Sequence, residues 1–417
     1  MTAKHARRDR VDGAGIYSTR LHLVLYSFLL ILTPFILVRN YLQNAIGEIT
    51  RFSMPIAGRD LPVVPVAALI VLAVLLVLLR SRLTRQRLVA GAIVLAMLAA
   101  AQQWTDFYAG MPFYSLQQNW HYIAYGVFVF MMYQDLAPRR VPMARIILVT
   151  YIVAMLFSAF DEFFQRHMSM RVFDISDIAK DTYGALLGLI LLYAWVTEPG
   201  ELRAGFRMVR HRKLGDYLAH PASLLVLLTA LTSSFVFFSA LLTGPGYLGT
   251  AVFLSIAGFL VFFVILHASQ FKWGKRGLLV LLVVALVAQG VAWFRGRDAG
   301  VVHRRPGLAV YHGVPVRFFD FMIYPDGRLR LMDKKTTFGF LDKRGLLKRE
   351  ADIIVVATGT DGSGGRGFPA ERESQFLYNR YTQRGTQVIR QRNPEACRTY
   401  NRLKREGKRV LLIFHNG

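Results

Sequence analysis

Long runs of apolar residues alternate with short polar segments over the first 295 residues of the chain. The runs at 61–79 and 222–242 contain no charged side chain, and apolar runs of about 18 residues or more are typical of helices that span a membrane. The pattern predicts about nine spans, separated by connections rich in polar residues. The predicted spans are 21–38, 61–79, 88–104, 119–134, 144–164, 178–196, 222–242, 248–268 and 277–294.

The hydrophobic pattern changes at about residue 305, and a linker is expected at 296–309. Short alternating runs predict strands at 314–324, 328–332, 353–357, 387–390 and 409–414, with helices at 371–384 and 394–406. Alternating strands and helices are typical of a parallel α/β unit. The sequence therefore predicts a polytopic α-helical membrane protein, with a transmembrane domain at 1–295 and a C-terminal soluble α/β domain at 310–417.

The chain carries a formal net charge of +25, which by itself would favour nucleic-acid binding. Much of this charge lies in short connections between apolar runs, as at 80–87 and 207–213, where basic residues fix the orientation of membrane helices. We therefore expect no nucleic-acid partner. The alternation of basic connections places the N-terminus in the cytoplasm, and nine spans then place the soluble domain on the extracytoplasmic side.

Two further sequence features concern the first apolar run and the single cysteine. The first apolar run follows a basic stretch, as in a signal peptide, but 21–38 is long for one and no cleavage site follows. We therefore interpret it as a retained helix. The single cysteine, Cys397, excludes an intramolecular disulfide, and nothing around it forms a nucleophile site, which favours a structural role.

Ionisable side chains gather at the fourth to sixth predicted spans, where they are costly unless they face a protein interior or water. Because successive spans alternate in direction, these side chains all fall near the outer membrane face. We expect them to form one binding site. The candidates are His121, Tyr125, Asp161, Glu162, Gln165, Arg171, Asp177 and Asp181.

Simpler structural roles compete with this interpretation for some candidates. Asp177 is suited to cap a helix N-terminus, His121 to lie at the membrane interface, and Arg171 to pair with a neighbouring carboxylate. The adjacent pair Asp161 and Glu162 has no obvious structural need at the end of an apolar run. The spacing matches no metal-binding motif and no cofactor motif, so neither a metal nor a cofactor is expected.

One helical stripe of the sixth predicted span continues from carboxylates into small residues. Its members are Asp177, Asp181, Gly184 and Gly188, which follow one another at helical spacing. Small residues at such spacing let two helix backbones approach closely in a membrane. The stripe therefore predicts a close helix contact directly below the carboxylates.

These residues resemble the VanZ-like family over about 115–195. The family pattern is H-x-x-x-Y, then D-E-x-x-Q, an Arg, and D-x-x-x-N-x-x-G, and Asp181 stands where the family usually has Asn. Its members are bacterial membrane proteins, and the namesake is associated with low-level teicoplanin resistance. The resemblance implies a cell-envelope location in the bacterial inner membrane and an effect on glycopeptide susceptibility. It does not supply a reaction.

A second resemblance lies in the soluble half. The stretches YPDG at 324–327, IVVATGT at 354–360 and ACRTYNRL at 396–403 are similar to the Mth938-like domain. Asn393 and Ala357 depart from that family's helix-opening Thr and strand-end Ile. The resemblance implies a compact α/β fold that binds a partner, because some relatives are linked to respiratory-complex assembly. The domain's basic charge favours an acidic protein partner or anionic lipid headgroups.

The glycine-rich segment 361–367 of this domain has two interpretations. A flexible loop is preferred. The alternative is an anion cradle made of backbone N–H groups, although the segment lacks the residues of a phosphate-binding motif.

Three functions remain open from the sequence. The first is binding of a polar headgroup or a lipid-linked envelope precursor near the outer membrane face. The second is an intramembrane hydrolase or transferase acting on an isoprenoid-linked substrate, with His121 as acid or base beside Asp161 and Glu162. The third is ion-coupled transport, ranked last because the charges lie near one surface and no internal repeat is present.

Overall fold

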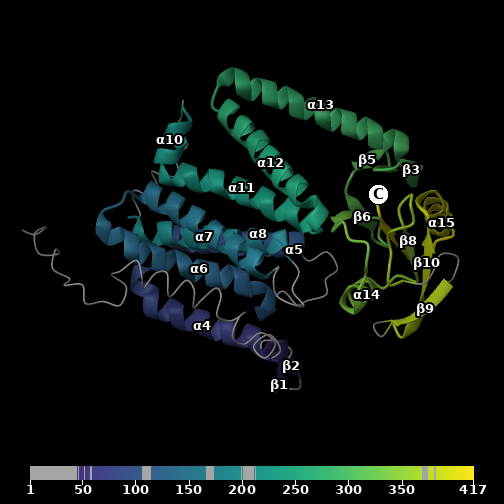
Figure 1. Ribbon diagram of the computed structural model, residues 1–417, viewed down its shortest axis with the longest axis horizontal. Helices are drawn as coiled ribbons and strands as arrows, with labels where there is room; N and C mark the ends of the chain where they lie inside the picture. The colour runs from purple at the N-terminus through teal and green to yellow at the C-terminus, as the bar shows by residue number, and fades with distance from the viewer. Residues whose placement is uncertain are drawn as a thin grey trace, which may run out of the picture. The chain divides into compact units, whose positions relative to one another are not determined.

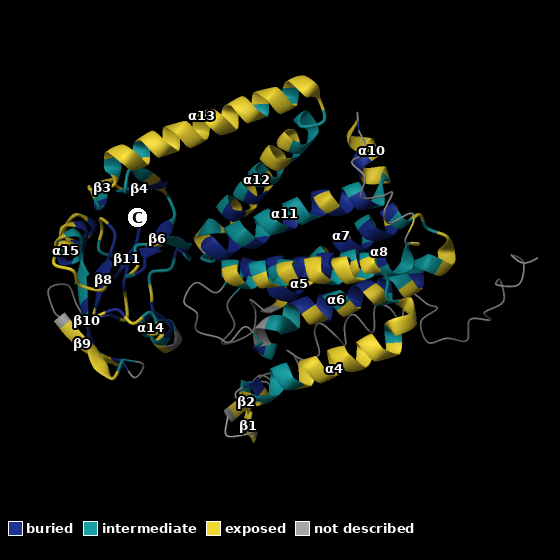
Figure 2. Cartoon of the chain, turned by 180° about the vertical axis from the view of Figure 1, so that it is seen from behind, coloured by how far each residue is buried: buried dark blue, intermediate teal, exposed yellow. Residues whose placement is uncertain are grey.

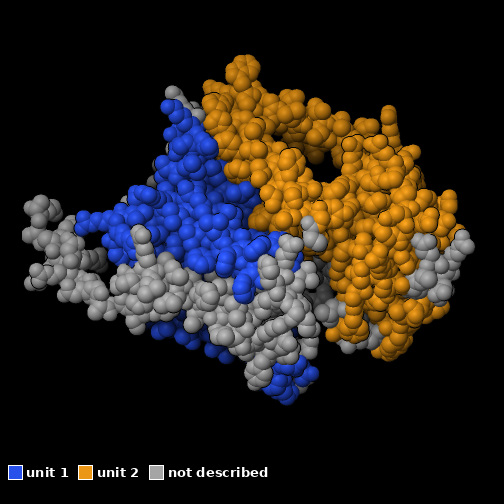
Figure 3. Space-filling model, in the orientation of Figure 1, with its two compact units in different colours: residues 1–98, 114–173, 177–232 blue, residues 99–113, 174–176, 233–417 orange. Residues whose placement is uncertain are grey.

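The computed structural model describes residues 45, 47–50, 52–56, 59–105, 114–165, 173–198, 200, 211, 213–368, 374–379 and 382–417. The chain divides into two compact units (Figure 3). The first comprises 1–98, 114–173 and 177–232, and the second comprises 99–113, 174–176 and 233–417. Each unit is described by itself below.

The first unit is built from long helices (Figure 1). A hairpin of β1 (Ser53–Ile56) and β2 (Arg59–Pro62) leads into the first of them. The helices are α4 (Val63–Leu79), α5 (Arg85–Thr105), α6 (Leu116–Leu136), α7 (Met143–Gln165), α8 (Ile175–Val196), α10 (Leu214–Ala219) and α11 (Pro221–Leu241). Short 3-10 turns follow α4 and α6, at Arg80–Arg82 and Ala137–Arg139. The helices α5 and α11 run across the boundary between the two units.

Helix α8 forms the centre of the first unit. Its side chains are buried along most of its length, and Leu186 and Leu189 are fully enclosed by Phe128 of α6 and Ile147 of α7 within one apolar core. Helix α4, in contrast, exposes apolar side chains along most of its length (Figure 2). A long, exposed apolar helix is unstable in water, so α4 is suited to face lipid.

Within the described part of the chain, six helices are long and apolar enough to cross a membrane: Val63–Arg82, Arg85–Thr105, Met143–Phe164, Pro221–Leu241, Leu248–Ala268 and Lys272–Gly296. Helices α6 and α8, which carry much of the predicted polar site, are not among these six. The first predicted span, 21–38, lies outside the described residues. These long apolar helices fit the predicted membrane protein, and the total of nine spans stays a prediction.

The second unit joins two apolar helices to the soluble domain. The 3-10 turn η3 (Pro245–Tyr247) is followed by α12 (Leu248–Ala268) and α13 (Lys272–Gly296). The turn before α12 contacts the soluble domain, because the Thr243 hydroxyl donates to Asp333 Oδ1 at 2.8 Å. Helix α12 leads away from this contact and α13 returns to the same domain. If both helices cross a membrane, Thr243 and the soluble domain lie on the same side of it.

A six-stranded mixed sheet forms the soluble domain, in the order β7-β6-β11-β8-β10-β9. The strands are β6 (Asp320–Ile323), β7 (Leu329–Met332), β8 (Ile353–Ala357), β9 (Ser374–Asn379), β10 (Arg384–Gln391) and β11 (Val410–Phe414). The predicted parallel arrangement holds at the centre, where β8 pairs in parallel with β10 and with β11. The outer strand pairs are antiparallel.

Two helices and a small second sheet complete the domain. Helix α14 (Phe340–Leu347) precedes β8, and α15 (Asn393–Arg405) connects β10 to β11. The side chains of Ala396, Tyr400 and Leu403 form the apolar face of α15 and pack into the sheet core. The second sheet contains β3 (Val301–Arg305), β4 (Leu308–Tyr311) and β5 (Val314–Arg317). Part of the segment 296–309, expected to be a linker, is thus strand.

The predicted helix at 371–384 is wrong. Residues Ser374–Asn379 form the edge strand β9, antiparallel to β10. Phe376 and Tyr378 are exposed on one face, whereas Asn379 is buried and donates its side-chain amide to Leu347 O at 2.9 Å. This alternation has the two-residue period of a strand, which the charged residues around it obscure.

Candidate functional site

A hydrogen-bonded network joins three helices of the first unit. His121 of α6 places Nδ1 2.8 Å from Oδ1 of Asp181 on α8. Ser158 of α7 donates its hydroxyl to the other carboxylate oxygen, Oδ2, at 2.6 Å. Asp181 is only 4% exposed, so this carboxylate is held by protein groups and not by bulk water. The network joins α6, α7 and α8 through one shared carboxylate.

The second ring nitrogen of His121, Nε2, lies near the N-terminal end of α8. Because Nδ1 is bonded to Asp181, Nε2 is the ring nitrogen that a further group can reach. It lies 3.9 Å from Oδ1 of Asp177, which also accepts from Lys180 Nζ at 2.7 Å. The side chains of His121, Asp177 and Lys180 are 18%, 27% and 20% exposed, so this side of the network is partly open.

Two adjacent carboxyl groups lie on α7 near this network. Asp161 and Glu162 are 5% and 2% exposed, near the end of the helix. Tyr125 of α6 is buried as well, and its hydroxyl lies within electrostatic range of both carboxylates and beside Ser158. That hydroxyl has no hydrogen bond of good geometry among the described residues. A buried phenol of this kind is available to a bound polar group.

A close contact between α6 and α8 sets the geometry of the site. A Cβ atom on Gly184 would lie 2.7 Å from the Tyr122 Cα, and one on Gly188 would lie 2.9 Å from the Gly126 Cα. Only glycine allows the two backbones to approach this closely. The predicted helix contact below the carboxylates is confirmed, and it brings Asp181 against His121.

Six of the predicted candidates lie in the described part of the first unit, and four of them share the network or adjoin it directly. The side chain of Gln165 and the whole of Arg171 lie outside the described residues. Two members, Ser158 and Lys180, were not predicted from the sequence. Ser158 carried a usable signal, because a hydroxyl one turn before Asp161 on an apolar helix faces the same side.

The arrangement is suited to hold polar groups more than to activate a nucleophile. The Ser158 hydroxyl donates to Asp181, and His121 bonds to the other oxygen of the same carboxylate, so Ser158 and His121 are not arranged as the directly bonded serine–histidine pair that activates a catalytic serine. Among the described residues, no group of three or more His, Cys, Asp or Glu side chains is arranged to hold a metal ion.

A second buried polar network lies in the soluble domain and was not predicted. Asp320 of β6 bonds to His415 Nδ1 and accepts from the Asn416 backbone N–H at 2.8 Å. Lys334 places Nζ 3.6 Å from Asp320 and donates to Asn416 O at 2.9 Å. All four residues are at most 8% exposed. The network binds residues 415–416 to the sheet, which is a structural role.

The glycine-rich segment 361–367 packs against this second network. The backbone N–H of Gly364 donates to Thr358 O at 2.9 Å, and that of Ser363 donates to Asp361 Oδ1 at 3.1 Å. Arg390 bonds to the carbonyl of Gly364 at 3.0 Å. The N–H groups of Ser363 and Gly364 are thus paired within the protein, which makes them poor donors to a bound anion.

Comparison with known proteins gives two matches. Residues 66–196 match the model of the VanZ/LLP1 family. A solved structure titled MT938 is 19% identical over 28% of this chain and 96% of its own, with a TM-score of 0.22. No curated protein matches the chain.

Proposed function

We propose that this membrane protein, whose residues 66–196 form a VanZ-like domain, binds the headgroup of a lipid-linked envelope precursor in the bacterial inner membrane. The network of His121, Asp181 and Ser158 supports this proposal most directly. It places a partly open imidazole beside buried carboxyls at one level of three helices. Such a group costs stability in an apolar environment, so it is expected to serve a ligand.

The charges of the site indicate which headgroup groups it contacts. Asp161, Glu162 and Asp181 concentrate acidic groups, which repel a bare phosphate. Carboxylate oxygens accept hydrogen bonds, and the Nε2 of His121 and the Tyr125 hydroxyl can donate or accept. The site therefore suits the hydroxyl, amide or amine groups of a sugar or peptide headgroup.

Topology is part of the proposal. We place the N-terminus in the cytoplasm and both the carboxylate cluster and the soluble domain on the extracytoplasmic side. The contact between Thr243 and Asp333 supports placing that turn and the domain on one side. Compartment-specific reporters fused after Arg139, Thr243 and Gly417 test it. We expect a cytoplasmic signal after Arg139 and external signals at the other two; a cytoplasmic Gly417 contradicts this topology.

Glycopeptide susceptibility provides a functional test of the binding site. In a bacterial strain lacking the gene, complementation with wild type is compared with His121→Gln and Asp181→Asn. We expect both variants to reach wild-type membrane levels and to lose the complementing effect. Asp135→Asn is the matched control, because Asp135 is a buried carboxylate that pairs with Arg139 at the other end of α6.

The outcome separates binding from folding. If both site variants complement like wild type, the proposal is contradicted. If the Asp135 control loses the complementing effect equally, the loss shows only a folding defect. The soluble domain, which we propose to be Mth938-like, is assigned a recruiting role toward an acidic protein partner.

A further inference from the structure

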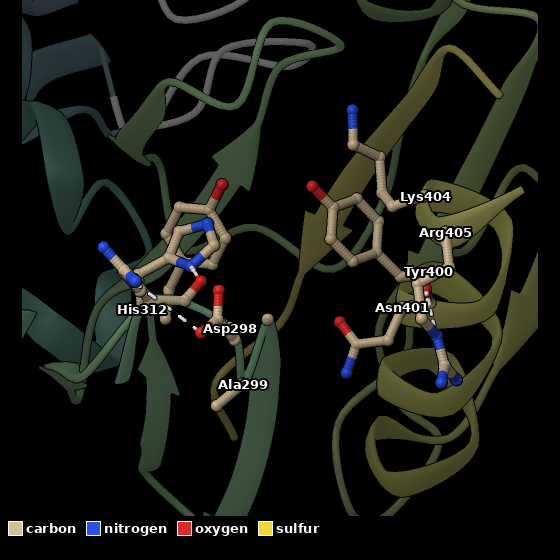
Figure 4. A pocket seen from close by; sticks show the side chains of 10 residues that line it. Asp298, Ala299, His312, Tyr400, Asn401, Lys404 and Arg405 are labelled. Atoms are coloured by element: carbon tan, nitrogen blue, oxygen red, sulfur yellow. Dashed lines mark hydrogen bonds and ion pairs between the residues drawn. The ribbon is translucent and has the colours of Figure 1, made fainter. Parts of the chain in front are cut away.

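A cavity of about 400 Å³ lies in the second unit, where α13 ends and the soluble domain begins (Figure 4). One wall comes from the connection between α13 and β3 together with the turn between β4 and β5. The opposite wall is one face of α15, from Tyr400 to Arg405. None of these residues belongs to the polar network of the first unit.

Positive charge predominates in the cavity lining. Arg297, Lys404 and Arg405 contribute three cationic side chains, against the single carboxylate of Asp298. Asp298 is 93% exposed and its carboxylate lies 3.7 Å from Arg297 Nε, so it neutralises little of the interior. The lining is therefore suited to an anion.

The two cations of α15 retain donors for a ligand. Lys404 Nζ donates to Pro325 O at 3.0 Å, which leaves two of its three protons. Arg405 uses Nε to contact Asn401 O at 3.3 Å, which leaves its terminal nitrogens at the rim. Neither side chain has a carboxylate partner within the described ranges. A bound anion would therefore supply a charge partner that the protein does not.

The cavity is preformed, because its neighbouring backbone is held rigidly. The side-chain amide of Asn401 accepts from Val301 N at 2.9 Å and donates to Val301 O at 2.8 Å. Gly300 has φ +62°, and a Cβ there would lie 2.2 Å from Asn401 Oδ1. The connection between α13 and β3 is thus locked onto α15. A preformed site binds without the entropy cost of ordering its walls.

Chain continuity places the cavity at a membrane surface. The first residue of the cavity lining, Arg297, directly follows the apolar helix α13. The last turns of α13 expose Trp293 and Phe294, and the Arg297 guanidinium lies 5.0 Å from the Phe294 ring centroid. Aromatic and basic residues in this order are typical of the boundary between lipid and water.

We propose that this cavity binds the phosphate-bearing headgroup of an anionic membrane lipid. Arg and Lys bind phosphate oxygens through strong charge-assisted hydrogen bonds, and at this boundary the abundant source of phosphate is phospholipid. The volume lies within the range of roughly 300–1,000 Å³ that is typical of sites for small molecules, so a whole headgroup fits. The bound lipid fastens the soluble domain to the membrane surface.

The test uses the full chain, purified in detergent and transferred to micelles containing phosphatidylglycerol or phosphatidylcholine. Native mass spectrometry counts the lipids retained. The pocket variant is Lys404→Gln with Arg405→Gln. The matched control is Arg398→Gln with Arg402→Gln, which removes two exposed bases from the same helix but outside the cavity. Lys404→Arg with Arg405→Lys keeps the charge.

We expect the pocket variant to bind phosphatidylglycerol about tenfold or more weakly than wild type, because each basic contact contributes roughly a factor of five. The control and the charge-conserving variant should bind within about twofold of wild type, a difference too small to count as the loss of one basic contact. An equal loss in the control overturns the proposal in favour of non-specific attraction. Glycerol phosphate or inorganic phosphate binding as tightly as the lipid overturns the lipid assignment.

Discussion

The Nδ1 atom of His121 lies 2.8 Å from the Oδ1 atom of Asp181, so one hydrogen bond ties α6 to α8. Ser158 occupies the other oxygen of the same carboxylate. Asp181 of α8 therefore joins its own helix to both α6 and α7. It uses a separate carboxylate oxygen for each bond, whereas the amide of an asparagine has only one oxygen.

We expect Asp181 and His121 to be energetically coupled. A double-mutant cycle with Asp181→Ala and His121→Ala should give a coupling of about 1–2 kcal/mol, the range of strong side-chain hydrogen bonds between membrane helices. The measurement is chemical unfolding of the purified protein in detergent. Strict additivity of the two single variants would contradict a direct bond between them.

Replacement of Gly184 by alanine should destabilise the first unit. The new Cβ would meet the Tyr122 backbone at 2.7 Å, and overpacking of this kind costs about 1–3 kcal/mol. Gly91→Ala is the control, because nothing lies within 4 Å of a Cβ placed there. Unfolding of both variants checks the difference. If they unfold alike, the contact between α6 and α8 is not as close as described.

The stability of the second unit should fall as the pH rises toward 8. Burial raises the pKa of the Asp333 carboxyl from 3.8 to about 7. The folded protein thus holds this proton more tightly than the unfolded chain, so the stabilisation is complete below about pH 4 and is lost as the pH passes through 7. Because Asp333 is still partly exposed, we expect a loss of only about 1 kcal/mol. The unfolding temperature between pH 5 and pH 8 measures it.

Asp333→Asn provides the control for this pH dependence. An amide oxygen still accepts the hydrogen bond from Thr243, but the side chain no longer titrates. The variant should therefore keep its stability across the range. An unchanged pH dependence would assign the effect to another group.

Cys397 should resist thiol reagents in the folded protein. Burial raises the pKa of this thiol to about 11, and the residue is only 5% exposed in the domain core. A thiol with this pKa holds almost no thiolate at pH 8, and the thiolate is the reactive form. Labelling with a maleimide should proceed only after denaturation. Rapid labelling of the native protein would contradict the structural role predicted from the sequence.

Apolar run length gave reliable predictions in the membrane half. The eight predicted spans that fall within described residues correspond to helices, because roughly twenty uninterrupted apolar residues leave few alternatives to a helix. The soluble half was harder. The strand at 353–357 was recognised as a short buried apolar run, and a helix was predicted at 394–406, close to the observed α15. The alternation of exposed and less exposed side chains in β9, with Phe376 and Tyr378 on the exposed face, was obscured by the charged residues around it.

Part of the candidate site could be predicted from the sequence. Charged residues are easily noticed in an apolar run, so His121 and Asp181 were singled out. Ser158 was not, although it lies one turn before Asp161, because a serine in a membrane helix commonly bonds to its own backbone. The network around Asp320 joins residues 95 positions apart, His415 among them, and that pairing depends on how β6 meets β11 in the sheet.

The contact between α13 and the β4–β5 turn brings two backbones directly together. A Cβ on Gly313 would lie 1.9 Å from Ala292 O, and one on Gly296 would lie 2.3 Å from Gly313 N. The His312 side chain of the same turn bonds to Arg297 O, directly after the helix. The last turn of α13 is thus held closely against the sheet of β3, β4 and β5. When the bilayer thins or thickens, a membrane helix adjusts its tilt. A change in the tilt of α13 would therefore be passed directly to this sheet.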